Sequence, residues 1–347
     1  MKRKWLCLLG IVISAVVAAG AQTKWLERSE RLTADGTWVD YPLPTPRSGP
    51  TTIALAKDGT LWFTEGGGNR IGRMAPDGTG LKEFALPNAD SSPRIIALGS
   101  DGNMWFSEHT GNRMGRITPD GTITEFPIPT ANSFPRAISL GGDGNIWFGE
   151  FGGGRIGRVT TKGEITEFPI PTPDAGPRAL ATGPDGNVWF SEFNTSKIGR
   201  ITAKGAITEF ALPRPNSGPG DITAGDDGAM WFVELSGRMD NHQPDGNRVG
   251  RITMDGKITE YPIPADAGMP SPINIAVGPD RNIWFTKGPM VVRVTRDGTM
   301  TPFRLPGDNA GGTGLTSGSD RQPPTRLTNK LWVAESGANK IAAMAFK

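Results

Sequence analysis

The sequence predicts an all-β protein: a seven-bladed β-propeller of four-stranded antiparallel blades, closed by an N-terminal strand that completes the last blade. The first observation behind this prediction is a repeated aromatic pair. Trp-Phe or Trp-Val recurs at intervals of 43, 42, 42, 42, 53 and 48 residues, at Trp62, Trp105, Trp147, Trp189, Trp231, Trp284 and Trp332. A period in the low forties is typical of stacked units that bury apolar faces against their neighbours. We therefore predict that these tryptophans form the core between blades.

The second observation is that one period holds four short strand-like segments. In the repeat 135–171, we predict strands at Ala137–Leu140, Asn145–Glu150, Arg155–Val159 and Ile165–Phe168. Asp143-Gly144 predicts a type I′ turn between the first two strands. Pro169 and Pro171 end the fourth strand because proline cannot donate to a ladder. Four antiparallel strands in each period are typical of a propeller blade.

The third observation concerns the two ends of the chain. The seventh repeat ends after its third strand, Lys340–Met344, and has no fourth. Residues Gly36–Pro44 match the fourth-strand pattern of Ile123–Pro129. The N-terminal segment is therefore expected to complete the last blade, and ring closure leaves only short, protected edges.

The first 21 residues differ from the rest of the chain. Lys2, Arg3 and Lys4 precede an apolar run, which ends in a small-residue Ala-Gly-Ala site. This pattern predicts a secretory signal peptide over 1–21 and a propeller over 22–347. The alternative is an uncleaved anchor, but the run is short for a membrane span. We expect a periplasmic or secreted protein with no membrane span after cleavage. Its one cysteine, Cys7, lies in the signal, so we expect no disulfide.

Charge excludes one class of partner. Removing residues 1–21 takes three of the 37 Lys and Arg and none of the 35 Asp and Glu, which leaves one net negative charge. A near-neutral chain without a basic run offers no basis for nucleic-acid binding. We expect a monomer that binds a small molecule or a protein.

Candidate site residues gather on one rim. The Asp-Gly turns share one rim, and the loops that join strand two to strand three and blade to blade share the other, which we call the top rim. Six strand-two segments end there in a glutamate: Glu65, Glu108, Glu150, Glu192, Glu234 and Glu335. Three strand-one segments place an arginine after their opening proline: Arg94, Arg136 and Arg178. We interpret these arginines, with Glu65 and Glu234, as ligand-binding.

Two alternatives stay open for these charged sets. The glutamates and arginines of repeats two to four can form a structural ring of salt bridges between strands one and two. Glu65, Glu234 and Glu335 lack such an arginine, and acids without a partner at the mouth of a propeller can bind a divalent cation. Both histidines of the chain also fall on this rim. His109 follows Glu108, and His242 lies in an insertion, so both are candidate catalytic residues.

The repeats resemble the virginiamycin B lyase (streptogramin lyase) family over the whole mature chain. The resemblance lies in stretches such as Ser133–Ile138, Gly144–Glu150, Arg155–Arg158 and Ile165–Pro171. It implies a Mg²⁺-dependent carbon–oxygen lyase that opens the ring of type B streptogramins by abstracting a proton and eliminating at the ester.

The resemblance also assigns positions to the catalytic groups. The slot of the catalytic histidine falls at Thr313, and that of a second histidine at Ile273. One metal carboxylate slot falls at Gly311, and the other at Glu335. Thr and Ile cannot accept a proton near neutral pH, as a general base must. We therefore predict a binding module. The alternative is a Mg²⁺-dependent lyase or hydrolase, acting on a cyclic ester or peptide-like substrate, whose rebuilt site uses His109 or His242 with Glu335.

Overall fold

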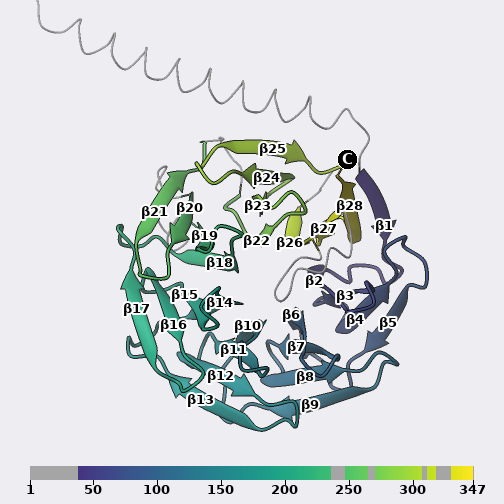
Figure 1. Ribbon diagram of the computed structural model, residues 1–347. Coiled ribbons are helices and arrows are strands. Elements are labelled where there is room, and N and C mark those ends of the chain that lie inside the picture. The colour runs from purple at the N-terminus through teal and green to yellow at the C-terminus, as the bar shows by residue number, and fades with distance from the viewer. Residues whose placement is uncertain (1–37, 236–246, 265–269, 307–310, 318–329, 347) are drawn as a thin grey trace, which may run out of the picture.

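A computed structural model describes residues 38–235, 247–264, 270–306, 311–317 and 330–346. Seven four-stranded sheets stand around a central axis like the blades of a propeller (Figure 1). In every blade the first strand is innermost and the fourth is outermost (Figure 1). The predicted fold class is confirmed. Within the described ranges, no helix is long and apolar enough to cross a membrane.

The strands follow the repeats. The first four blades contain β2 (Pro50–Leu55), β3 (Leu61–Glu65), β4 (Arg70–Met74) and β5 (Lys82–Ala85); β6 (Pro93–Leu98), β7 (Met104–Glu108), β8 (Arg113–Ile117) and β9 (Ile123–Pro127); β10 (Pro135–Leu140), β11 (Ile146–Glu150), β12 (Arg155–Val159) and β13 (Ile165–Pro169); β14 (Pro177–Thr182), β15 (Val188–Glu192), β16 (Lys197–Ile201) and β17 (Ile207–Ala211). The last three contain β18 (Pro219–Ala224), β19 (Met230–Glu234), β20 (Arg248–Ile252) and β21 (Ile258–Pro262); β22 (Ile275–Val277), β23 (Ile283–Lys287), β24 (Met290–Val294) and β25 (Met300–Arg304); β26 (Gly312–Thr316), β27 (Lys330–Glu335), β28 (Lys340–Ala345) and β1 (Trp38–Pro42).

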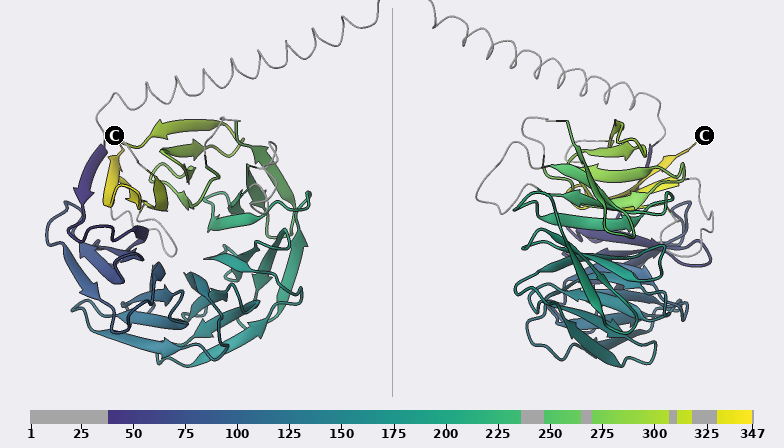
Figure 2. Two further views of the ribbon diagram at one scale, coloured as in Figure 1. Left: turned by 180° about the vertical axis from the view of Figure 1, so that it is seen from behind. Right: turned by 60° about the vertical axis from the view of Figure 1, so that its left-hand side comes forward.

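The ring closes as predicted. Strand β1 pairs antiparallel with β28, with Trp38 opposite Met344 and Pro42 opposite Lys340. Seen from behind, the ring has β1, drawn in purple, at the outer edge of the last blade (Figure 2, left). The first 37 residues, including the predicted signal peptide, lie outside the described residues.

The turn between the first two strands of a blade differs from the prediction. A type I′ turn needs positive φ at both central residues, but only Gly144, with φ 77°, has it, and Asp143 does not. The Gly144 N–H donates to Gly141 O, and the Gly141 N–H donates to Asn145 O. This is a three-residue hairpin loop whose last residue is left-handed. The predicted type was wrong because the Asp143 carboxylate accepts the Asn145 N–H (3.2 Å) and the Trp147 Nε1–H (3.0 Å), which fixes a longer loop.

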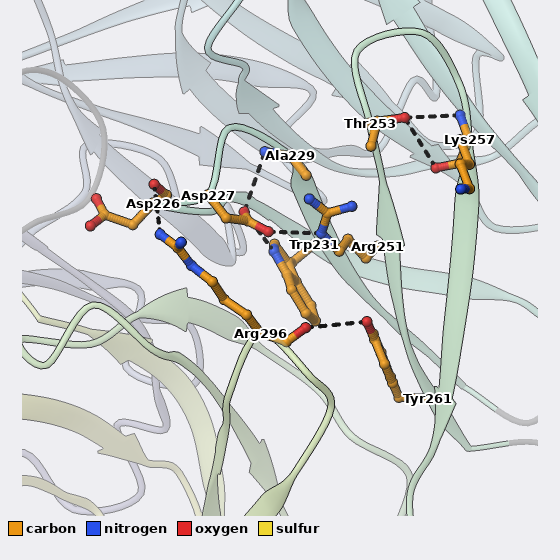
Figure 3. Close-up of polar contacts among 9 residues, drawn as sticks. All are labelled: Asp226, Asp227, Ala229, Trp231, Arg251, Thr253, Lys257, Tyr261 and Arg296. Atoms are coloured by element: carbon orange, nitrogen blue, oxygen red, sulfur yellow. Dashed lines mark hydrogen bonds and ion pairs between the residues drawn. The ribbon is translucent and has the colours of Figure 1, made fainter.

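The repeated tryptophans fill the space between blades, as predicted, and each is at most 2% exposed. Trp231 shows the common arrangement (Figure 3). Its Nε1–H donates to Asp227 (3.1 Å), and the Arg251 guanidinium lies 5.9 Å from its ring. Tyr261 stacks on the same ring at 5.7 Å and donates its O–H to the Arg296 carbonyl of the next blade. The repeated Ile-Gly-Arg motif serves the same purpose, since the arginines that end it, Arg73, Arg158 and Arg200, each lie over a core tryptophan.

The glycine of that motif makes room for a phenylalanine. A Cβ at Gly157 would lie 2.1 Å from Phe148 Cζ, which is far shorter than any contact between non-bonded carbon atoms. In the last blade the same facing positions hold Val333 and Ala342, so a smaller strand-two residue accompanies a larger strand-three residue. Close packing of this kind tolerates little added volume.

We expect Gly157→Ala to lower the free energy of unfolding by about 1–3 kcal/mol because Phe148 must leave its position. Gly311→Ala is the matched control, since a Cβ at Gly311 meets nothing within 4 Å. Urea unfolding followed by tryptophan fluorescence measures both. Equal stability of the two variants would contradict this account of the motif.

Candidate functional site

Three arginines stand side by side at the top ends of the inner strands β6, β10 and β14. Each follows a buried proline that opens its strand. The ladder between strands one and two is irregular at each of these points, so Arg94, Arg136 and Arg178 have no partner in the register. A β-bulge changes the direction in which the side chain at the bulge points.

Aromatic side chains from the neighbouring loops flank these arginines. The Arg136 guanidinium lies 5.3 Å from the ring of Phe151, and that of Arg178 lies 5.0 Å from the ring of Phe193. The rings of His109 and Phe134 lie 5.5 Å apart, and Phe134 is 39% exposed. We call this set the arginine–aromatic half-rim: Arg94, Arg136, Arg178, His109, Phe134, Phe151 and Phe193.

The half-rim concentrates positive charge. Burial, with repulsion from Arg178 and Arg94, lowers the pKa of Arg136 to about 9. Burial and Arg94 lower the pKa of Arg178 to about 10, against attraction from Asp221. Burial also lowers the pKa of Arg94. Among the described residues, none of the three forms an ion pair with a carboxylate. Half-buried cations that repel one another are costly to hold together without an anion.

Asp221 is the acid whose charge acts on Arg178, but its Oδ2 is already engaged. It accepts hydrogen bonds from the Asn274 side chain (2.6 Å) and from the Ile275 N–H (3.1 Å). The carbonyl oxygen of the Asn274 side chain accepts the Leu315 N–H (2.8 Å). Asp221 therefore links the inner strands of three consecutive blades.

A cavity of about 600 Å³ runs along the inner strands below the half-rim, and Arg178, Asp221 and Asn274 line it. Most of its other lining residues are apolar, and they include Leu55, Leu98 and Leu140 near the opposite ends of their strands. We call this cavity the central shaft. Its volume falls within the range of pockets that hold small molecules.

His109 belongs to the half-rim, whereas His242 lies outside the described residues. His109 Nδ1 lies 3.3 Å from the Pro135 carbonyl oxygen. Burial, followed by the charge of Arg94, lowers the pKa of His109 and so favours the neutral imidazole, although the hydrogen bond to the Pro135 carbonyl acts in the opposite direction. Glu335 lies in the last blade, and the first blade separates that blade from His109. The structure therefore does not bring His109 and Glu335 together.

The six strand-two glutamates are not accessible at the top rim. All are 0% exposed. The predicted salt bridges to the strand-one arginines are wrong, because the register places a strand-three cation directly opposite each glutamate, as with Glu108 and Arg113 (3.7 Å). Glu65, Glu234 and Glu335 have no strand-one arginine, as the sequence shows, but the interpretation of these three as acids without a partner is wrong. Their neighbours are Arg70, Arg214 (3.6 Å) and Lys340 (3.5 Å).

At the positions that the family resemblance assigns to catalysis, Thr313 and Glu335 make contacts that hold the fold together. The Thr313 hydroxyl donates to the carbonyls of Pro50 (3.0 Å) and Ala334 (3.2 Å). Glu335 is the one carboxylate at the assigned metal slots, and Lys340 Nζ lies against it while also donating to Asp40 (2.7 Å). The described residues hold no group of three metal-ligating side chains. This donor set does not fit Mg²⁺, which needs several oxygen ligands.

Comparison with known proteins assigns the chain to a family. A model described as the virginiamycin B lyase family matches residues 21–242 and 181–347. The chain belongs to the virginiamycin B lyase family.

Solved structures of Staphylococcus aureus virginiamycin B lyase are similar to this chain. A selenomethionine-substituted form has 33% identity and a TM-score of 0.80, and the match covers 89% of this chain and 99% of that one. A catalytically inactive histidine-to-alanine variant with quinupristin has 34% identity, the same TM-score and the same coverage. A curated Bacillus licheniformis virginiamycin B lyase is 45% identical over 40 residues, which span 12% of this chain and 14% of that protein.

Sequence reasoning identified the three arginines but not their aromatic neighbours. Phe151 and Phe193 directly follow the strand-two glutamates, at the position that His109 holds one repeat earlier. That shared position is a signal in the sequence that places an aromatic ring beside each arginine. The engagement of Asp221 has no such signal, because its partners lie more than fifty residues away.

Proposed function

We propose that this protein is an exported ligand-binding propeller that holds an organic anion on its arginine–aromatic half-rim. The observation that carries the proposal is the set of three neighbouring arginines without a carboxylate partner among the described residues. Guanidinium groups bind carboxylates, sulfonates and phosphates through paired hydrogen bonds. The rings of Phe151 and Phe193 hold two of these groups in place and offer apolar contact to a ligand.

Family membership leaves the type of activity open, because function depends on the site rather than the fold. Thr313 and Ile273 supply no base at the slots that the resemblance assigns, and Lys340 engages Glu335. These features favour binding over the family's lyase reaction. Export rests on residues 1–21, and N-terminal sequencing of the exported chain should give Gln22 as its first residue.

The test uses anilinonaphthalene sulfonate, a fluorescent aromatic anion, as the probe. We expect saturable binding to the protein and a loss of affinity of roughly 100-fold or more in the triple variant Arg94→Gln, Arg136→Gln, Arg178→Gln. The matched control is Lys162→Gln, Lys204→Gln, Lys257→Gln, which removes the same charge from exposed turns of the opposite rim. Equal affinity of the two triple variants would refute the proposal.

His109 favours a second candidate, a lyase or hydrolase with a rebuilt site. The lowered pKa of His109 favours the neutral imidazole that a general base requires, and two arginines beside it can stabilise a developing anion. Under this candidate, His109→Gln abolishes turnover of a cyclic ester while leaving anion binding intact. Under the binding proposal, the wild-type protein and its His109→Gln and His242→Gln variants all leave a cyclic ester unconverted. Product analysis by mass spectrometry separates the two.

A further inference from the structure

The central shaft begins beside Arg178 and offers a ligand little polar contact of its own. Asp221 and Asn274 line it on the same side as Arg178, but they bind each other and the backbone of neighbouring blades. Among the described lining residues at this end, Arg178 is the one that can offer a positive charge to an anion. Beyond it the lining is mainly Ala, Ile and Leu.

We propose that the ligand is an amphipathic anion, with its head group on Arg178 and the neighbouring arginines and an unbranched apolar tail in the central shaft. This inference rests on the proposed function and narrows it to a chemical class. Burying an alkyl chain against apolar walls is favourable in proportion to the area removed from water. A sugar phosphate or a polyanion would find few partners for its polar groups below the rim, where Ala, Ile and Leu make up most of the lining.

The volume of the central shaft is suitable for the tail of an amphipathic anion. A cavity of about 600 Å³ is large enough for a medium or long alkyl chain, whereas a small inorganic anion would leave most of it unused. The opposite end of the shaft also carries a cation, Lys57, which is exposed and follows β2. The direction of the ligand is therefore a testable part of the proposal: the head group lies at Arg178, among three arginines, and not at Lys57.

Calorimetric titration with butanoate, hexanoate, octanoate and decanoate, below their micelle-forming concentrations, tests the inference without altering the protein. We expect affinity to rise roughly fourfold with each added methylene until the shaft is filled. Arg178→Gln should lower the affinity for every chain length by the same factor, roughly tenfold or more. Lys57→Gln should leave all four affinities unchanged.

Each other outcome overturns part of the account in a recognisable way. Affinity that depends on Arg178 but not on chain length overturns the shaft as the tail site and leaves the anion-binding function standing. Affinity that rises with chain length but ignores Arg178, or that falls with Lys57→Gln instead, overturns the proposed head-group site. If the Arg94, Arg136, Arg178 triple variant also binds the sulfonate probe normally, the proposed function itself fails.

Discussion

Replacing Glu150 by Gln is expected to make the propeller more stable at about pH 8.5 and to flatten its loss of stability between about pH 5 and pH 8.5. Glu150 is fully buried. Burial, followed by repulsion from the Glu167 carboxylate, raises its pKa from 4.5 to about 8, although Arg155 acts in the opposite direction. Gln has nearly the same shape and carries no charge at any pH.

The direction of the effect follows from proton linkage. Between pH 4.5 and about 8 the folded protein holds a proton on Glu150 that the unfolded chain has released. The stabilisation from this group is therefore complete below pH 4.5 and is lost as the pH rises through 8. Burial also raises the pKa of the five equivalent glutamates to about 7, so the wild-type protein should lose stability across the same range.

Melting temperatures measured across this pH range test the prediction. Glu164→Gln is the control, because Glu164 is exposed on the opposite rim and should leave the slope unchanged. If Glu150→Gln destabilises the protein more at pH 8.5 than at pH 5, Glu150 is ionised and paired with Arg155, and the account of these buried acids is wrong.

The second large effect concerns the lyase reaction of the family. We expect no ring opening when the protein is incubated with quinupristin and Mg²⁺, whereas S. aureus virginiamycin B lyase serves as the positive control. The physical reason is that Thr313 donates its hydroxyl proton to backbone carbonyls and that Lys340 lies against Glu335. Mass spectrometry and chromatography detect a linear product of unchanged mass. Such a product, lost on adding EDTA, would show that the chain has rebuilt the lyase site.

The sequence predicted the architecture well because its periodicity is strong. The spacing of residues such as Trp105 and Trp147 determined the number of blades, and the fourth-strand pattern around Trp38 predicted ring closure. The type of the hairpin at Asp143-Gly144 was predicted wrongly because that prediction used only these two residues. The Asp143 side chain also accepts a hydrogen bond from Trp147, which a two-residue pattern does not show.

The site was predicted less completely, because its contacts join different repeats. The arginines were found from a repeated position, but the partner of Glu108 was misassigned to strand one. The spacing of five residues between Glu108 and Arg113 places them opposite each other across a hairpin, so this pairing could have been inferred. The central shaft had no signal in the sequence, since its walls come from seven separate strands.

The most direct test of the central claim is to locate an anion on the protein. Crystals grown with 4-iodobenzoate would reveal its iodine by anomalous diffraction. The account predicts a site on the half-rim, with the carboxylate bound by Arg136 and Arg178 and the ring near Phe151 or Phe193. Iodine found only elsewhere, with the three guanidinium groups in contact with carboxylates of the protein itself, would contradict it.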